Sequence, residues 1–132
     1  MDISKYADYF HDGDVKAIFH IGNNISFFLE SSVIEDIGQI EDVEYLSSSN
    51  TFKGTLCLYN IRNFTLNEKK YEDVFQKQHD DGDILDLEIV RNAIFLLIEW
   101  MDFPPKVRKT DVSAIKIEAE MIEWIPDKES AQ

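Results

Sequence analysis

Two short stretches of the chain combine histidine with carboxylates, the residue types that bind metals and transfer protons. They read HDGD at residues 11–14 and HDDGD at residues 79–83. Metal phosphohydrolases place such doublets on helices and add further histidines, whereas this chain has three histidines in all, the third being His20. We therefore predict that each Asp-Gly pair forms a turn leading into a strand, with aspartate carboxylates capping backbone N–H groups.

Other catalytic and metal-binding patterns have less support. Calcium needs six or more oxygen ligands, normally from a longer loop than Asp80, Asp81 and Asp83 provide, so weak binding at a carboxylate cluster is the alternative left open. Glu30 and Glu99 recur at matching positions, which fits a repeated surface residue better than an acid–base pair. No phosphate-binding loop or zinc spacing is present. We predict no catalytic residue, no metal site and no cofactor.

The charge of the chain restricts its partners. The 132 residues contain 26 aspartates and glutamates against 13 lysines and arginines, a formal net charge of −13. So negative a surface repels phosphate backbones and anionic lipids, which argues against direct nucleic-acid or membrane binding. It attracts a basic protein, although acidity that only maintains solubility is the alternative.

Acidic residues gather in one segment that has no cations. No lysine or arginine occurs from Ala17 to Phe52. If this segment covers one side of a sheet, that side is strongly negative and suits a basic partner. The candidate partner-binding residues are acids of this segment and two outward acids of a later strand, namely Glu35, Asp36, Glu41, Asp42, Glu44, Asp86 and Glu88.

Cysteine usage and hydropathy indicate a cytoplasmic protein. Cys57 is the single cysteine, so an internal disulfide is excluded and a reducing compartment fits. It lies in the alternating run TLCLYNI, which is typical of a strand near a core rather than of a nucleophile. The first ten residues are too polar for a signal peptide, and the longest purely apolar stretch, residues 93–98, is too short to span a membrane.

Hydrophobic alternation and turn residues predict antiparallel strands. GNN at residues 22–24 and RN at residues 91–92 each separate two β-rich runs, which indicates two hairpins. Residues 32–50 fit either a helical turn or two, lined by Val33, Ile37 and Ile40, or a loop. Further strands are predicted over 51–66 and 114–125, and a short helix over 2–10 with Asp2 as its N-cap.

The alternation also predicts which side chains face the core. In the second hairpin Leu85, Leu87 and Ile89 face one way, and Asp86 and Glu88 face the other. In the last strand the predicted inward residues are Ile115, Ile117, Ala119 and Met121. Trp100 and Trp124 are expected in the core.

The two hairpins are similar in sequence. Residues 11–31 align with 80–100 without a gap, with six identities and the turn in the same place. We predict one domain, 1–132, built from an internal repeat over 11–66 and 80–125. The fold class expected is mainly β, an antiparallel sandwich or flattened barrel of two pseudo-symmetric hairpin-plus-strand halves with one or two short helices. Two ordinary hairpins that share turn chemistry are the alternative.

Two segments carry a resemblance to a family. DISKYADYFHDGDV and DILDLEIVRNAIFLLIEW, followed by DFPP, are similar to small uncharacterised bacterial all-β proteins whose first hairpin opens with HDG. This resemblance covers most of the chain and implies no activity and no functional residues. In size and charge the chain also resembles immunity proteins of bacterial toxin systems, an analogy that fold alone does not turn into a function.

The expected function is therefore non-enzymatic protein binding, and its sharpest version is an immunity-type inhibitor that docks a basic toxin through acidic residues. Two alternatives stay open. One is a small-ligand or metal-binding protein, or an enzyme, with a site between the two halves. The other is a structural module that associates with itself as a homo-oligomer.

Overall fold

A computed structural model describes residues 1–77, 79–105 and 110–127 of the chain. A 3-10 helix precedes the first hairpin, and two further 3-10 turns lie between that hairpin and the third strand. In chain order the elements are η1 (Ile3–Phe10), β1 (Asp14–Ile21), β2 (Asn24–Glu30), η2 (Ile37–Gln39), η3 (Val43–Tyr45), β3 (Lys53–Leu66), β4 (Lys69–Lys70), β5 (Asp81–Val90), β6 (Ala93–Met101) and β7 (Thr110–Pro126).

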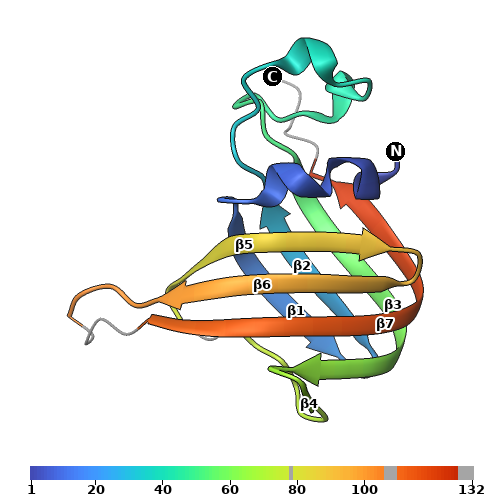
Figure 1. Ribbon diagram of the computed structural model, residues 1–132, viewed down its shortest axis with the longest axis vertical. Helices are drawn as coiled ribbons and strands as arrows, with labels where there is room; N and C mark the ends of the chain where they lie inside the picture. The colour runs from blue at the N-terminus through green and yellow to red at the C-terminus, as the bar shows by residue number, and fades with distance from the viewer. Residues whose placement is uncertain (78, 106–109, 128–132) are drawn as a thin grey trace.

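The strands form one antiparallel sheet in the order β2-β1-β5-β6-β7-β3-β4, and β2 also pairs with β3. Figure 1 shows the consequence: β5, β6 and β7 lie in front of β1, β2 and β3, so the sheet is folded over into two layers. Strands β1 and β5 share one residue pair, Asp14 with Asp83, and therefore the sheet does not close into a clear barrel. The prediction of a mainly β, antiparallel fold with short helical pieces is confirmed.

The two hairpins have the same internal geometry. Asp14 pairs with Glu30 in the first and Asp83 with Glu99 in the second, a constant shift of 69 positions. The bulges match too, because the first lies between Val15 and Ala17 and the second between Ile84 and Asp86. Each hairpin then pairs with a long strand, β2 with β3 and β6 with β7. Both hairpins therefore hold the same place in their half of the sheet.

The bulge in β5 changes which side chains reach the core. Ile84 and Leu87 are buried, whereas Leu85 is the extra residue at the bulge and is only half-buried. The predicted inward set of Leu85, Leu87 and Ile89 was therefore wrong at Leu85. Asp86 and Glu88 face outward as predicted, because the bulge restores the alternation after Leu85.

Strand β7 changes phase near its middle. Ile115, Ile117 and Ala119 are buried as predicted, but Met121 is exposed. The neighbouring strand explains the shift, because Asn60 adopts a left-handed backbone with φ of 56° opposite this point of β7. Beyond it Trp124 turns toward the core and lies edge-on to the Phe10 ring.

Helix η1 covers one end of the two layers. Asp2 caps it as predicted, since its carboxylate accepts a hydrogen bond from the Ser4 backbone N–H. Its buried side chains, Ile3, Tyr6, Ala7 and Phe10, join the core. Within the described residues, no helix has the length and apolar character needed to cross a membrane.

Candidate functional site

The first His-Asp-Gly stretch holds the backbone at the entrance to β1. His11 and Asp12 form a turn in which Asp12 has a φ of 67°, and the Asp12 N–H donates to the Ile84 carbonyl at 2.8 Å. The His11 imidazole Nδ1 lies within hydrogen-bonding distance of the Leu85 carbonyl. This histidine therefore contacts the backbone of the other half, and the predicted turn is confirmed here.

The second stretch differs from the prediction. Asp81 and Gly82 already belong to β5, paired with Met101 and Trp100, so this Asp-Gly is not a turn. The reason is packing: a Cβ on Gly82 would come within 2.7 Å of the Trp100 ring. The bend precedes it at His79, whose Nδ1 lies 2.8 Å from the Asp102 carboxylate. His79 and His11 thus have different partners.

Three aspartates come together where the two halves meet. Oxygens of Asp14, Asp81 and Asp83 lie within 4.8 Å of one another. Burial and the negative charges of Asp81 and Asp14 raise the pKa of Asp83. Asp80, the third residue considered for calcium, instead accepts a hydrogen bond from the Phe103 N–H. One oxygen from each carboxylate gives three converging ligands, fewer than calcium prefers, and the three negative charges repel one another.

The halves differ in how this charge is balanced. In the first half the bulge residue is Lys16, whose ammonium lies 3.5 Å from both the Asp14 and the Glu30 carboxylates. In the second half Leu85 occupies the matching position beside Asp83 and Glu99. The second hairpin therefore lacks the cation that the first hairpin provides for itself.

The long segment between β2 and β3, residues 31–52, is hereafter the connector. Its ends are tied together, because the Ser31 N–H donates to the Phe52 carbonyl and the Phe52 N–H donates to the Ser31 hydroxyl, both at 2.8 Å. Further along, the Ile34 N–H donates to the Asn50 carbonyl at 2.9 Å. The connector is thus an Ω-like loop anchored at its base, a type of loop that is frequently functional.

Five of the seven acids predicted to bind a partner lie on this loop. Four are exposed: Glu35, Asp36, Glu41 and Glu44. Asp42 is half-buried and has a structural role, because its carboxylate accepts a hydrogen bond from the Tyr6 hydroxyl at 2.6 Å. The bond fixes the loop to η1, so the four exposed acids are presented from an anchored backbone.

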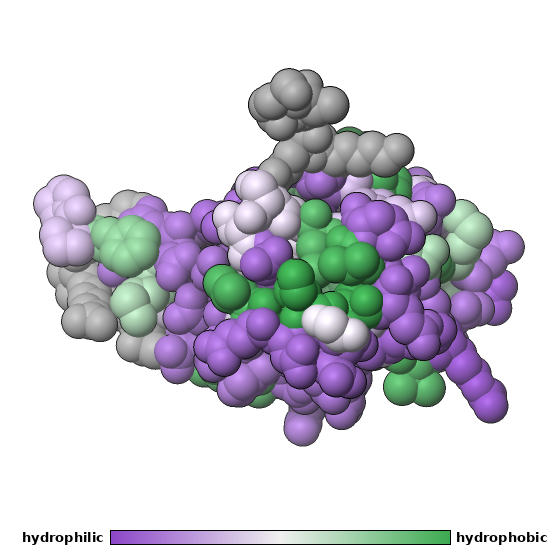
Figure 2. All heavy atoms as spheres, turned by 90° about the horizontal axis from the view of Figure 1, so that it is seen from above, coloured by the Kyte–Doolittle hydropathy of each residue, from purple (hydrophilic) through white to green (hydrophobic). Residues whose placement is uncertain are grey.

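The connector also exposes apolar side chains. Val33 is 62% exposed, Ile37 39% and Val43 46%, whereas Ile34 and Ile40 are the buried anchors. Seen from above in Figure 2, hydrophobic residues gather at the end where Figure 1 places the connector, and hydrophilic residues border them. We define the connector surface as Val33, Ile37 and Val43 together with Glu35, Asp36, Glu41 and Glu44.

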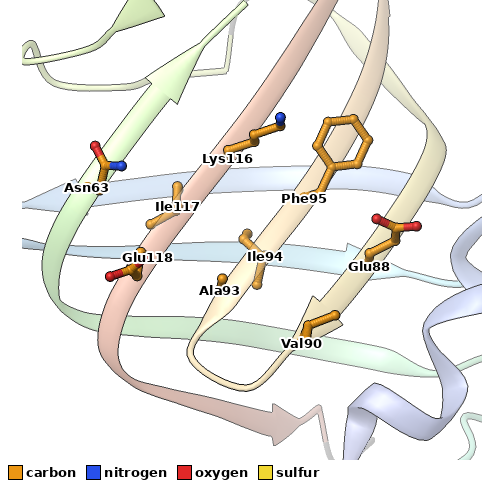
Figure 3. A pocket seen from close by; sticks show the side chains of 9 residues that line it. All are labelled: Asn63, Glu88, Val90, Ala93, Ile94, Phe95, Lys116, Ile117 and Glu118. Atoms are coloured by element: carbon orange, nitrogen blue, oxygen red, sulfur yellow. The ribbon is translucent and has the colours of Figure 1, made fainter. Parts of the chain in front are cut away.

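The predicted residues Asp86 and Glu88 lie elsewhere, on the outer side of β5. Helix η1 contacts β5 and stands between this strand and the connector (Figure 1). The seven predicted acids are therefore divided between two surfaces. Glu88 borders an apolar hollow of about 300 Å³ that is floored in part by Val90 and Phe95 and lined by neither His11 nor His79 (Figure 3).

Comparison with known proteins adds no relative to this description. No protein-family model, no curated protein and no solved structure matches the chain. The resemblance to small bacterial β proteins, and the analogy with immunity proteins, therefore stay predictions.

Proposed function

We propose that this protein is a non-enzymatic binding module whose connector surface docks a basic protein. The observation that carries the proposal is the connector surface itself, in which three exposed apolar side chains lie among four exposed acids. Apolar centres with polar rims are the usual anatomy of a protein interface. The single sign of the rim selects a partner of the opposite charge.

The length of the connector supports a role beyond folding. The second half joins its hairpin to its long strand through residues 102–109, eight residues, whereas the first half uses residues 31–52, twenty-two residues. Both connections lead to the same pairing of hairpin and strand. A short link therefore satisfies the fold, and the additional chain is available for recognition.

The sharpest version of the proposal is an immunity-type inhibitor of a basic bacterial toxin, acting in the cytoplasm. Its support is the small size, the charge of −13 and the acidic rim of the connector surface. The four acids would steer the toxin during encounter, and Val33, Ile37 and Val43 would hold it after docking. Growth of cells that express the toxin encoded beside this gene tests this version, since the protein should restore growth.

The broader proposal is tested by capture with matched variants. The protein, tagged, is incubated at low salt with an extract of its source cells, and recovered proteins are quantified by mass spectrometry. One variant removes three charges from the connector surface, Glu35→Gln/Asp36→Asn/Glu44→Gln. The control removes three charges of the same types elsewhere, Glu68→Gln/Glu72→Gln/Asp73→Asn, all exposed.

We expect one basic protein that the wild type and the control recover and that the connector variant loses. Its recovery should fall as salt is raised, because exposed charges are screened. The pair Val33→Thr/Val43→Thr should recover less of the same protein by speeding its dissociation. Equal recovery by the connector variant and its control would contradict the proposal.

A further inference from the structure

On the outer face formed by β5, β6 and β7, β5 carries mainly acidic side chains and β6 carries mainly apolar ones. Gly82, Ile84 and Leu87 of β5 are buried, so the residues between them point outward. Apart from the bulge residue Leu85, the outward residues of β5 before Val90 are acidic: Asp81, Asp83, Asp86 and Glu88. Those of β6 are apolar except for Glu99: Ala93, Phe95, Leu97 and Met101. We call this surface the β5–β7 face.

Strand pairing places the acidic column of β5 directly beside the apolar column of β6. Asp86 pairs with Leu97, and Glu88 pairs with Phe95. A carboxylate therefore stands next to an apolar side chain in successive rows, about 5 Å apart across the strands and about 7 Å apart along them. The apolar hollow of Figure 3 continues this column at Val90, Ala93 and Phe95.

Among the residues that the structure describes, no salt bridge neutralises the acidic column in the way that Lys16 acts in the other half. Lys16 neutralises Asp14 and Glu30 there, but Leu85 takes its place beside Asp83 and Glu99. On the β5–β7 face Lys116 is held over the Phe95 ring, 5.8 Å from its centroid. The column is therefore complementary to cations that another molecule supplies.

The sheet topology decides how such a molecule is placed. β6 is paired on both sides, with β5 and with β7, so a partner strand has no free edge to join there. A partner that contacts both the acidic side chains of β5 and the apolar side chains of β6 therefore lies across the face, as a helix packs on a sheet. A helix has side chains of one flank about 6 Å apart at i and i+4, close to the spacing of the carboxylates along β5.

We infer that the β5–β7 face binds a basic amphipathic helix of a partner protein, with the helix's apolar stripe on Ala93, Phe95 and Leu97 and its lysines or arginines along the acidic column of β5. This surface is separate from the connector surface, and the inference does not depend on the proposed function. A second copy of the chain is a poor occupant, because it brings a charge of −13 to a negative face.

A designed peptide tests the inference. It is an eighteen-residue helix-forming peptide with leucines on one stripe and lysines at i and i+4 beside it, and its control is the scrambled sequence of the same composition. Binding is measured by calorimetry, and the contact surface is mapped by amide chemical shifts. We expect shifts at residues 86–97, and weaker binding of the scrambled peptide.

Matched variants give the decisive comparison. Asp86→Asn/Glu88→Gln should weaken binding by about two- to thirtyfold, the range for losing two exposed charge pairs. Glu68→Gln/Asp73→Asn removes the same two charges elsewhere and should leave the affinity unchanged. Phe95→Thr should also weaken binding, with circular dichroism and melting confirming that each variant is folded.

The inference would be overturned by equal affinity for the two peptides, by equal effects of the two charge variants, or by shifts confined to residues 33–44. The last would locate helix binding on the connector surface and leave the proposed function standing. A concentration-dependent dimer in sedimentation that Phe95→Thr abolishes would also overturn it, by making a second copy the occupant.

Discussion

At the scale of single residues, the unbalanced charge of Asp83 is the clearest difference between the two halves. Its counterpart Asp14 has Lys16 within 3.5 Å, while Asp83 has Asp81 and Asp14 as negative neighbours. Burial and these charges raise the pKa of Asp83, so the folded chain favours the protonated acid. Protonated Asp83 therefore contributes to the free energy of unfolding. This contribution is complete below the ordinary aspartate pKa of 3.8 and is lost as pH rises through the raised pKa.

Asp83→Asn should therefore stabilise the protein at neutral pH. We expect the free energy of unfolding at pH 7 to rise by up to about 1 kcal/mol, and the gain to vanish below pH 3.8. Urea unfolding across this range measures it, with the exposed Asp73→Asn as control.

Leu85→Lys, which copies Lys16, should also stabilise at pH 7. Repeating the series in EDTA and in millimolar calcium separates repulsion from metal binding, and a gain that disappears in EDTA would contradict the account.

Two glycines at matching positions are required for different contacts. A Cβ on Gly13 would lie 2.2 Å from the Glu30 carbonyl oxygen, whereas one on Gly82 would lie 2.7 Å from the Trp100 ring. A backbone atom yields less than a side chain. We expect Gly13→Ala to cost about 3 kcal/mol of unfolding free energy and Gly82→Ala about 1–2 kcal/mol. Thermal or urea unfolding checks the order, and a larger loss for Gly82→Ala would contradict it.

At the scale of elements, the connector is the part that the fold does not need. Because the Ile34 N–H already bonds the Asn50 carbonyl, these two residues can be joined by a two-residue Asn-Gly link in place of 35–49. We expect a folded, cooperative protein that loses about 2–3 kcal/mol of stability, mainly through the buried Ile40. Circular dichroism and urea unfolding measure this. A chain that no longer unfolds cooperatively would show that the connector is part of the folding core.

Sequence reasoning succeeded where one local signal determined the outcome. Both hairpins were predicted from the turn residues after Ile21 and Val90 and from the alternation of apolar residues in the strands on either side of each turn. Asp2 predicted the start of η1. It failed at Leu85, because a bulge leaves no mark in an alternating pattern. It left residues 32–50 open between helical turns and a loop, because the exposure of Val33 and Ile37 depends on how the connector is tied to η1 rather than on their spacing.

At the scale of the whole molecule, features that the two halves share are those that the fold requires, and features that differ between them are available for binding. Matched register and matched bulges show what the fold requires of each half. The departures from symmetry are the long connector, the exposed apolar residues on it, and the leucine that replaces a lysine at the second bulge. Each departure adds apolar surface or unbalanced negative charge at the surface. The sequence predicted the negative charge, but the division of the acids between two surfaces arises only from the folding of the sheet.

Amide hydrogen exchange, measured with and without the basic protein recovered by capture, tests the central claim most directly. We expect slower exchange over residues 33–44 in the complex, with residues 62–73 at the opposite end unchanged. Protection that spares 33–44 would contradict the connector surface as the binding site.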